Sequence, residues 1–366
     1  MDDKKNTIFI ALYNAFPMTS GASTVTTSLF KCWPTRKKFL FQITHENPKN
    51  EQNIFSYKII SNNRFVKLFT LPFYLLFIFR KILKKRNNIK FFVIEGASWV
   101  GYIYVFQLIL KIFFKNSKFI YHSHNVESDI RKNKFLVSSL TYYFENKVMK
   151  NFDFVTAVSE KDQSIFLKKF KQVTYLLENG VFIDKKILKQ KHKIKNFIVF
   201  PGSLEFSENK KTFDNLYKKI FPFLKKKINK KLSIILTGSG IKFFKNNNDI
   251  NEVGVLKKTI FLNYLISSWP LIIPSKKGPG TKIKIIEALC YNKIVFATKD
   301  AFNGIDTQYQ NEIIYLNNDE LFKKLIAYKK NPKKLSKKYR ILGKYYRNKF
   351  DMNIISKKFY ETIKNR

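Results

Sequence analysis

The chain has 366 residues, of which 45% are hydrophobic and 16% aromatic, so it holds enough apolar material for two packed cores and is not a disordered chain. Lysine and arginine number 69 against 26 acidic residues, which gives a net charge of +43. Such a charge suits nucleic acid or an anionic membrane as a partner, although the codon bias of an AT-rich genome produces the same composition.

The cysteines and the N-terminus both indicate a cytoplasmic protein. Cys32 and Cys290 lie in no CxxC pair and in no cluster with zinc-type spacing, which argues against a disulfide framework. The first residues, MDDKKNTIFIALYNAF, lack a long apolar run after a basic start, so we expect no signal peptide. Because the chain is strongly positive, we also expect it to associate peripherally with the inner face of the cytoplasmic membrane.

Strand and helix signals alternate in the first half of the chain. Residues 7–12 (TIFIAL) form a continuous apolar run, which is typical of a buried parallel strand. A loop with Pro17 and Gly21 follows, and then a helix near residues 23–31. Further strands are expected at residues 39–43, 90–94, 118–122 and 153–158. Strands separated by helices predict βαβ units in a parallel sheet.

Two apolar stretches resemble short membrane segments. They are residues 71–83 (LPFYLLFIFRKIL) and 99–114 (WVGYIYVFQLILKIFF). Both are shorter than the roughly 20 apolar residues that a spanning helix needs, and both contain polar side chains. We therefore expect helices packed on the sheet, with the alternative that one of them exposes an apolar face to lipid.

A second alternation begins after a basic, polar segment at residues 185–196, which suits a linker. Strands are expected at residues 197–200, 232–236, 271–273, 294–297 and 312–316, and roughly the last forty residues are predicted to be helical. The predicted fold is α/β, with two Rossmann-like doubly wound domains facing a central cleft. In such sheets ligands bind at the carboxyl ends of the strands.

The segment at residues 274–290 (PSKKGPGTKIKIIEALC) is the strongest functional signal. Pro274 ends a strand, Gly278 and Gly280 belong to a tight turn, and Thr281 is a suitable N-cap for the helix that follows. Backbone N–H groups at such a helix start point into the cleft, with the positive end of the helix dipole behind them. This arrangement is suited to holding a diphosphate.

Charged side chains surround the same turn. Lys276, Lys277 and Lys282 would add positive charge at the helix start. Glu287 lies less than two helical turns beyond Thr281, so its carboxylate can face the cleft and accept hydrogen bonds from ribose hydroxyls. A plain strand–turn–helix with solvated lysines has the same composition, and the residues alone leave both interpretations open.

Six segments, in this order along the chain, resemble glycosyltransferase family 4, a retaining family with the GT-B fold. They are residues 20–22 (SGA), 121–127 (YHSHNVE), 158–162 (VSEKD), 178–181 (ENGV), 200–209 (FPGSLEFSEN) and 278–289 (GPGTKIKIIEAL). The resemblance covers most of the chain. We divide the chain into an N-terminal acceptor-side domain (1–190), a C-terminal nucleotide-sugar domain (191–345) and a C-terminal helix (346–366) that packs back on the first domain.

The resemblance implies roles for particular residues. Glu287 would contact the nucleotide ribose. The diphosphate would lie against Gly278, Gly280, Thr281, Lys276 and Lys282, with the glycine loop at Gly21 approaching from the other domain. His124 is the expected catalytic residue, near the donor sugar. The family needs no essential metal and no cofactor, since the UDP- or GDP-linked sugar is the substrate.

The chain also departs from the family pattern. Many members have two glutamates eight positions apart in the donor loop, and the earlier position here is Pro279. Many have an arginine and a lysine after the first strand of the second domain; here Ser203 occupies the arginine position and the lysine position falls near Glu208. We keep Ser203 as a donor-site residue and expect lysines such as Lys210 to replace the missing charge.

Three further polar groups follow strands of the first domain. His122 and His124 both lie at or just past a strand end, and each of them could instead cap the strand by bonding a carbonyl. Glu95 ends another strand and is a candidate acceptor-binding residue. Glu127 and Arg131, four residues apart, are expected to form an ion pair on one helix.

The resemblance implies a retaining, hexosyl-type glycosyltransferase that acts on a glycan or lipid-linked acceptor in bacterial cell-envelope polysaccharide synthesis, with lipopolysaccharide as one setting. An anionic membrane surface is the expected further partner, and nucleic acid is disfavoured because no nucleic-acid motif accompanies the lysines. The alternative is a basic nucleic-acid- or membrane-binding protein on a catalytically degenerate transferase scaffold, which Pro279 and Ser203 suggest.

Overall fold

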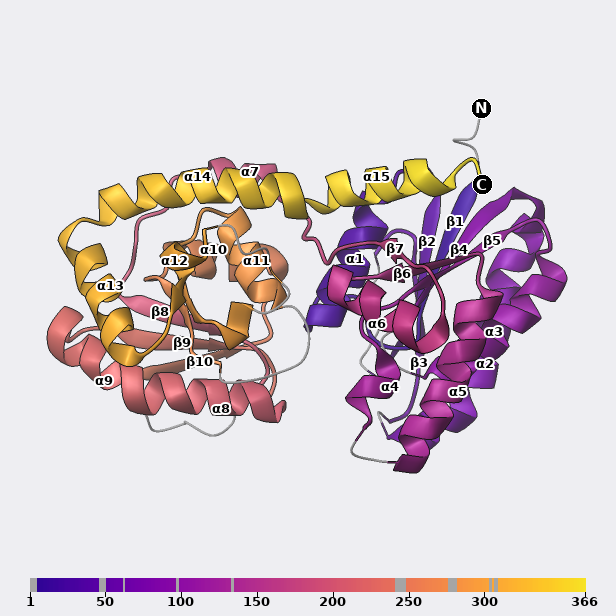
Figure 1. Ribbon diagram of the computed structural model, residues 1–366, viewed down its shortest axis with the longest axis horizontal. Helices are drawn as coiled ribbons and strands as arrows, with labels where there is room; N and C mark the ends of the chain where they lie inside the picture. Colours follow the sequence, from indigo (N-terminus) through magenta and orange to yellow (C-terminus); the bar gives the residue numbers. More distant parts are fainter. Residues whose placement is uncertain are drawn as a thin grey trace. The chain divides into compact units, whose positions relative to one another are not determined.

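The structure is a computed structural model that describes residues 5–45, 51–61, 63–96, 99–132, 135–240, 248–275, 282–302, 305 and 309–366. The chain forms two compact units (Figure 1). Residues 1–18, 22–178 and 355–366 make up the first unit, and residues 19–21 and 179–354 make up the second. The domain boundaries expected from the sequence stay predictions.

The first unit is built on one parallel sheet in the order β3-β2-β1-β4-β5-β6-β7. Its strands are β1 (Asn6–Ala11), β2 (Lys38–Thr44), β3 (Ile54–Lys58), β4 (Ile89–Glu95), β5 (Lys118–His122), β6 (Phe154–Ala157) and β7 (Tyr175–Leu176). The order runs outward in both directions from β1 and β4. This is a doubly wound sheet, and its switch point lies between these two strands.

Helices cover both faces of this sheet. They are α1 (Gly21–Cys32), α2 (Arg64–Ile82) with the 3-10 segment η2 (Leu83–Asn88), α3 (Val100–Phe113), α4 (Glu127–Ile130), α5 (Phe135–Asn151), α6 (Glu160–Phe170) and α15 (Met352–Ile363). Alternate residues of β1 face opposite sides: Ile8 and Ile10 belong to the core beneath α2 and α3, whereas the ring of Phe9 packs against Phe30 of α1. The buried strands therefore read as continuous apolar runs.

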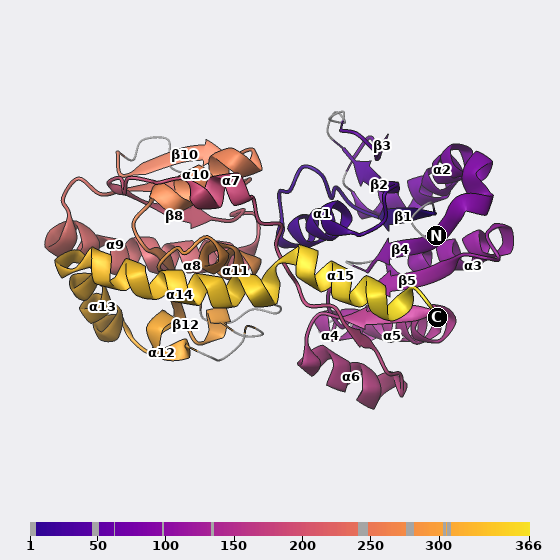
Figure 2. The same ribbon diagram turned by 90° about the horizontal axis from the view of Figure 1, so that it is seen from above.

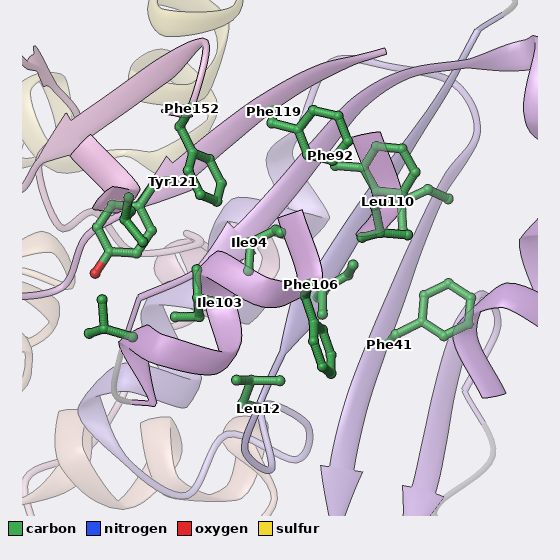
Figure 3. Close-up of a cluster of buried hydrophobic side chains, with 14 of the residues drawn as sticks. Leu12, Phe41, Phe92, Ile94, Ile103, Phe106, Leu110, Phe119, Tyr121 and Phe152 are labelled. Carbon is green, nitrogen blue, oxygen red and sulfur yellow. The ribbon is translucent and has the colours of Figure 1, made fainter. Parts of the chain in front are cut away.

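The core beneath α2, α3 and α5 is rich in aromatic side chains (Figure 3). Phe92 of β4 stacks on Phe119 of β5 at a ring-centroid distance of 5.0 Å, and Phe106 of α3 lies in the same cluster. Each large apolar side chain that is fully buried contributes roughly 1.5–3 kcal/mol to the stability of the folded state. This core fixes the positions at which β4 and β5 end.

The opposite face of the same sheet is covered in part by the C-terminal helix α15, as Figure 2 shows. The indole ring of Trp33 lies 5.7 Å from the ring of Tyr360, which also packs on Phe91 of β4. Ser356 Oγ donates to the Cys32 carbonyl at 2.8 Å. The last helix of the chain is thus part of the first unit's core.

The second unit has two three-stranded parallel sheets in the orders β10-β9-β8 and β11-β12-β13. The strands are β8 (Phe197–Pro201), β9 (Ser233–Thr237), β10 (Ile250–Gly254), β11 (Leu271–Ile273), β12 (Val295–Thr298) and β13 (Ile314–Tyr315). The helices are α7 (Lys185–Lys189), α8 (Ser207–Asn215), α9 (Phe221–Phe223), α10 (Lys258–Ser267), α11 (Ile283–Cys290), α12 (Gln310–Ile313), α13 (Asn318–Lys330) and α14 (Pro332–Phe350), with π-helical segments at Leu216–Ile220 and Leu224–Ile228 and a 3-10 turn at Asp300–Phe302.

The predicted α/β class with parallel sheets is confirmed. The two apolar stretches form most of α2 and α3, which pack on the first sheet. In the part of the chain that the structure describes, no helix combines the length and apolar character that crossing a bilayer requires.

Candidate active site

The carboxyl ends of β4 and β5 bring Glu95 and His122 side by side. The two residues are direct register partners, and β4 borders the switch point of the sheet. His122 Nδ1 lies 2.9 Å from Glu95 Oε2, so the ring N–H donates to the carboxylate. Both side chains are buried. The position is the one at which doubly wound sheets bind ligands.

Three more side chains, Tyr13, Thr26 and His124, lie against this pair. We call the five residues Tyr13, Thr26, Glu95, His122 and His124 the Glu95 cluster. His124 Nε2 and Thr26 Oγ1 each lie 2.7 Å from Glu95 Oε2, which therefore accepts three hydrogen bonds. The Tyr13 hydroxyl lies 2.6 Å from Thr26 Oγ1 and 3.4 Å from His124 Nε2. Among the described residues, nothing hydrogen-bonds to the other carboxylate oxygen, Glu95 Oε1.

The charges of this cluster are set by burial and by the two imidazoles. Burial alone would raise the pKa of Glu95, but His122 and His124 outweigh it through charge and hydrogen bonds and hold the pKa at about 2. Burial lowers the pKa of His124 and exceeds the opposing effect of its hydrogen bond to Glu95. The favoured state is an ionised carboxylate that holds a neutral His124 with its proton on Nε2, which leaves Nδ1 as an acceptor.

Glu95, His122 and His124 also offer the donor atoms of a metal site, since these atoms lie within 4.8 Å of one another. Two imidazoles and one carboxylate suit Zn²⁺ or Fe²⁺. Ligands at about 2.1 Å from one tetrahedral ion would lie about 3.4 Å apart, whereas the two Glu95–histidine distances are 2.9 and 2.7 Å. The geometry favours protons between these groups, and the expectation that the site needs no metal stays a prediction.

The residues predicted in the first domain therefore have defined places. His124 belongs to the Glu95 cluster, as does Glu95 itself, the candidate for acceptor binding. Gly21 is the first residue of α1 and is exposed, and a Cβ atom there would meet no atom within 4 Å. Glu127 and Arg131 form the expected ion pair. The substrate contacts assigned to these residues stay predictions.

In the second unit, the loop after β8 is held rigidly around Ser203. The Ser203 hydroxyl lies 2.8 Å from Ser239 Oγ in the loop after β9, and Asn209 Nδ2 donates to the Ser203 carbonyl at 2.9 Å. Gly202 has φ +147°, and a Cβ atom there would lie 2.9 Å from the Asn209 side chain. Only glycine fits at this position without displacing Asn209.

Two lysines lie at the start of α11, close to this loop. Lys284 Nζ donates to the Pro201 carbonyl at 3.0 Å and to Asn209 Oδ1 at 3.2 Å. Burial, together with the charge of Lys282, lowers the pKa of Lys284 to about 8. Burial also lowers the pKa of Lys282, against the attraction of Glu208. A bound anion would relieve the cost of these partly desolvated ammonium groups, at a helix end whose dipole favours anions.

Glu287 lies one turn further along α11 and is only 3% exposed. Its carboxylate forms an ion pair with Lys258, the first residue of α10. A buried carboxylate is costly unless it is paired, and this partner supplies the opposite charge. Glu287 is therefore held in one place, against the start of α10.

Four predicted donor-site residues, Lys276, Gly278, Gly280 and Thr281, lie outside the described residues. Of the donor-site predictions in the second unit, the structure places Ser203, Lys282 and Glu287 at the loop after β8 and along α11.

Sequence reasoning missed several members of these clusters. Lys284 lies three residues before Glu287 on the same helix, so helical spacing could have found it. Asn209 closes the segment FPGSLEFSEN, and its side chain orders the loop in which that segment begins. Lys258, Tyr13 and Thr26 carry no local signal, because their partners are distant in the sequence.

No family model matches the chain, and no curated protein matches its sequence. Solved structures match over nearly its whole length. Alr3699/HepE from Anabaena, in complex with UDP and glucose, is 14% identical with a TM-score of 0.66, over 98% of this chain and 100% of that one. The catalytic domain of starch synthase IV from Arabidopsis thaliana, bound to ADP and acarbose, is 12% identical with a TM-score of 0.64, over 99% of both chains.

WaaG, a glycosyltransferase involved in lipopolysaccharide biosynthesis, is 11% identical with a TM-score of 0.64, over 98% of this chain and 100% of that one. At such identities the likeness concerns the fold. The chain has the GT-B fold of these glycosyltransferases, and the predicted fold is confirmed.

Proposed function

We propose that the protein is a retaining glycosyltransferase. It transfers a hexosyl unit from a UDP- or GDP-linked sugar to a glycan or lipid-linked acceptor, in bacterial cell-envelope polysaccharide synthesis. It works in the cytoplasm, at the inner face of the cytoplasmic membrane. The observation that carries the proposal is the set of charges on α11: Lys282 and Lys284 at its start, followed by the buried Glu287. The GT-B fold supports it.

The donor's diphosphate fits the start of α11. When the bond between the sugar's anomeric carbon and the diphosphate breaks, negative charge grows on the departing oxygen. Fixed positive groups are most effective when they are in place before that charge develops. Lys282 and Lys284 are such groups, and the Gly202–Ser203 loop beside them is rigid. They take the place of the arginine–lysine pair that the chain lacks.

Glu287 is assigned to the nucleotide ribose. A carboxylate accepts hydrogen bonds from two vicinal hydroxyls, and the ion pair with Lys258 orients this one. One glutamate is sufficient for this role, so Pro279 does not by itself argue against a working enzyme.

His124 is assigned to the reacting sugar. Its Nε2–H is committed to Glu95, so Nδ1 is available to accept a hydrogen bond from a sugar hydroxyl. In the reaction, the anomeric carbon exchanges its bond to the diphosphate for a bond to the acceptor oxygen, and the acceptor proton leaves with the diphosphate. Retention means that the new bond has the same anomeric configuration as the old one.

A binding panel tests the proposal. Wild-type protein is heated with UDP, GDP, ADP, CMP and their sugars, and we expect one nucleoside diphosphate and its sugars to raise the melting temperature. Glu287→Gln should weaken that ligand's binding by roughly 10- to 100-fold, the value of a charged hydrogen bond. The matched control is Glu361→Gln in α15, which removes a surface ion pair with Lys364 just after that helix.

Two outcomes would count against the proposal. One is the absence of any nucleotide-dependent stabilisation. The other is binding that Glu287→Gln and the control affect equally, since this would place the nucleotide away from α11.

A further inference from the structure

Large apolar side chains form an exposed stripe along α2. Phe65, Phe69, Phe73 and Leu76 follow helical spacing, and each is more than half exposed, with Phe69 at 72%. Arg80 is exposed and continues the same stripe at the C-terminal end of the helix. An amphipathic surface helix normally shows water its polar face. Here the face turned away from the core is apolar, with a cation at its end.

Helix α5 repeats this pattern. Leu136, Leu140 and Tyr143 are exposed at helical spacing, and Leu136 is 80% exposed. Lys147 follows on the same stripe, with its ammonium group 5.5 Å from the centre of the Tyr143 ring. An aliphatic and aromatic surface that ends in a cation is the composition of helices that lie in a membrane interface.

Helix α3 lies between these two and joins their surfaces (Figure 2), with Val105, Leu108 and Ile112 exposed along it. Pro72 of α2 has no N–H to give to the Leu68 carbonyl, and the hydroxyl of Tyr102 in α3 donates to that carbonyl instead, at 2.7 Å.

On the other side of α3, Tyr104 packs on Phe144 of α5 at a centroid distance of 6.4 Å. The three helices therefore present one contiguous surface, which we call the outer apolar face and define as the exposed side chains of α2, α3 and α5. Exposed apolar surfaces that span several elements mark interaction sites.

The charge of the outer apolar face indicates which kind of partner it binds. Helices α2 and α3 contain no Asp or Glu, and the single acid of α5, Glu145, is fully buried and accepts from the backbone N–H groups of Glu127 and Ser128. The face thus combines apolar side chains with cations and no exposed acid. A second copy of the chain would set like charges against each other, which disfavours self-association. Anionic lipid matches both properties.

We infer that the outer apolar face docks on an anionic lipid bilayer, with Phe69, Phe73 and Leu136 entering the headgroup region and Arg80 and Lys147 meeting lipid phosphates. The inference deepens the proposed function and rests on it for its purpose, since it names the surface by which the enzyme reaches a lipid-linked acceptor. Helices α2 and α5 begin at the end of the sheet where the carboxyl termini of the strands lie. The Glu95 cluster lies at the same end.

Flotation with vesicles tests the inference on the full chain. Vesicles of phosphatidylglycerol and phosphatidylethanolamine are compared with vesicles of phosphatidylcholine alone, at low and high salt. We expect binding to the anionic vesicles that salt weakens and does not abolish, because the apolar contribution is unscreened. The double variants Phe69→Ser/Phe73→Ser and Leu136→Ser/Leu140→Ser should each reduce vesicle binding at least tenfold.

The matched control is the double variant Leu316→Ser/Ile341→Ser in the second unit, where Leu316 is 81% exposed; it should bind vesicles as the wild type does. Equal loss in the control, no binding to anionic vesicles, binding to duplex DNA in their place, or dimerisation through the face would each overturn the inference. Nucleotide-induced thermal stabilisation is measured on the same variants without lipid. If it persists while vesicle binding fails, the docking face alone is wrong; if it is absent from all proteins, the proposed function fails separately.

Discussion

His124 Nε2 lies 2.7 Å from Glu95 Oε2, and the same oxygen accepts from His122 Nδ1 at 2.9 Å. One carboxylate oxygen therefore orients two imidazoles and fixes the tautomer of each. The contact links the end of β4 to the segment after β5, and it makes Glu95 a positioning residue for His124, whatever further contact Glu95 Oε1 makes.

Replacing Glu95 by Gln should test its role in positioning His124. The amide keeps the shape of the side chain but loses its charge, so all three buried donors lose a charged acceptor. We expect the free energy of unfolding to fall by roughly 1–3 kcal/mol. We also expect kcat to fall by a larger factor than the factor by which KM for the donor changes. Urea unfolding and initial rates measure both. An unaltered kcat in a folded variant would contradict the positioning role.

Acid should remove the contribution of Glu95 in a defined range. Its folded-state pKa of about 2 lies below the ordinary value of 4.5, so its contribution is complete above pH 4.5 and is lost as the pH falls towards 2. The pKa of His124 is also lowered, from 6.5, so its contribution is complete above pH 6.5 and declines below it. The difference in unfolding free energy between wild type and Glu95→Gln should shrink between pH 4.5 and 2; a constant difference would refute the assignment.

Because of Lys284, nucleotide binding should weaken as the pH rises through the alkaline range. Its pKa of about 8 means that the ammonium form, which attracts a diphosphate, is lost as the pH rises through 8. A bound diphosphate raises that pKa, so binding near pH 8 takes up protons. Isothermal titration from pH 7 to pH 9 should show affinity falling by up to about tenfold, and Lys284→Met should flatten the profile. The exposed Lys357→Met is the control, and an identical profile in Lys284→Met would contradict the role.

Gly96 should resist any substitution. A Cβ atom there would lie 2.6–2.7 Å from the Tyr121 ring, which is fully buried and cannot move aside. We expect Gly96→Ala to lower the free energy of unfolding by about 1–3 kcal/mol, as overpacking does. Gly21→Ala, where a Cβ meets open space, should change it by less than about 0.5 kcal/mol. If Gly96→Ala and Gly21→Ala shifted the unfolding midpoint equally, the structure would have relaxed to relieve the close contact with Tyr121, and the prediction would be wrong.

Most of the sheet could be predicted from the sequence, because buried parallel strands are short apolar runs between helices. Strands β3 (Ile54–Lys58), β7 (Tyr175–Leu176) and β10 (Ile250–Gly254) were not predicted. All three are edge strands. β7 has only two residues, and β3 and β10 contain polar residues such as Ser56 and Glu252, so none of them has a long continuous apolar run. The expected strand at residues 312–316 is shorter in the structure, since Ile313 ends the helix α12.

The candidate site divides in the same way. Glu287 and His124 lie in recognisable local segments and were predicted. Thr26 meets Glu95 across 69 residues of sequence, and Lys258 meets Glu287 only because the start of α10 lies beside α11. Neither contact leaves a pattern in a single sequence, since tertiary packing alone creates it.

Turnover of nucleotide sugars tests the central claim most directly. Purified wild-type protein is incubated with UDP- and GDP-linked hexoses, with water in the place of the acceptor, and the nucleoside diphosphate released by hydrolysis is quantified beside Glu287→Gln and Glu361→Gln. We predict release from at least one donor by wild type and by Glu361→Gln, with a rate roughly 10- to 100-fold lower for Glu287→Gln. No release by the wild-type protein, or equal release by all three, would contradict the assignment of α11 as the donor site of a glycosyltransferase.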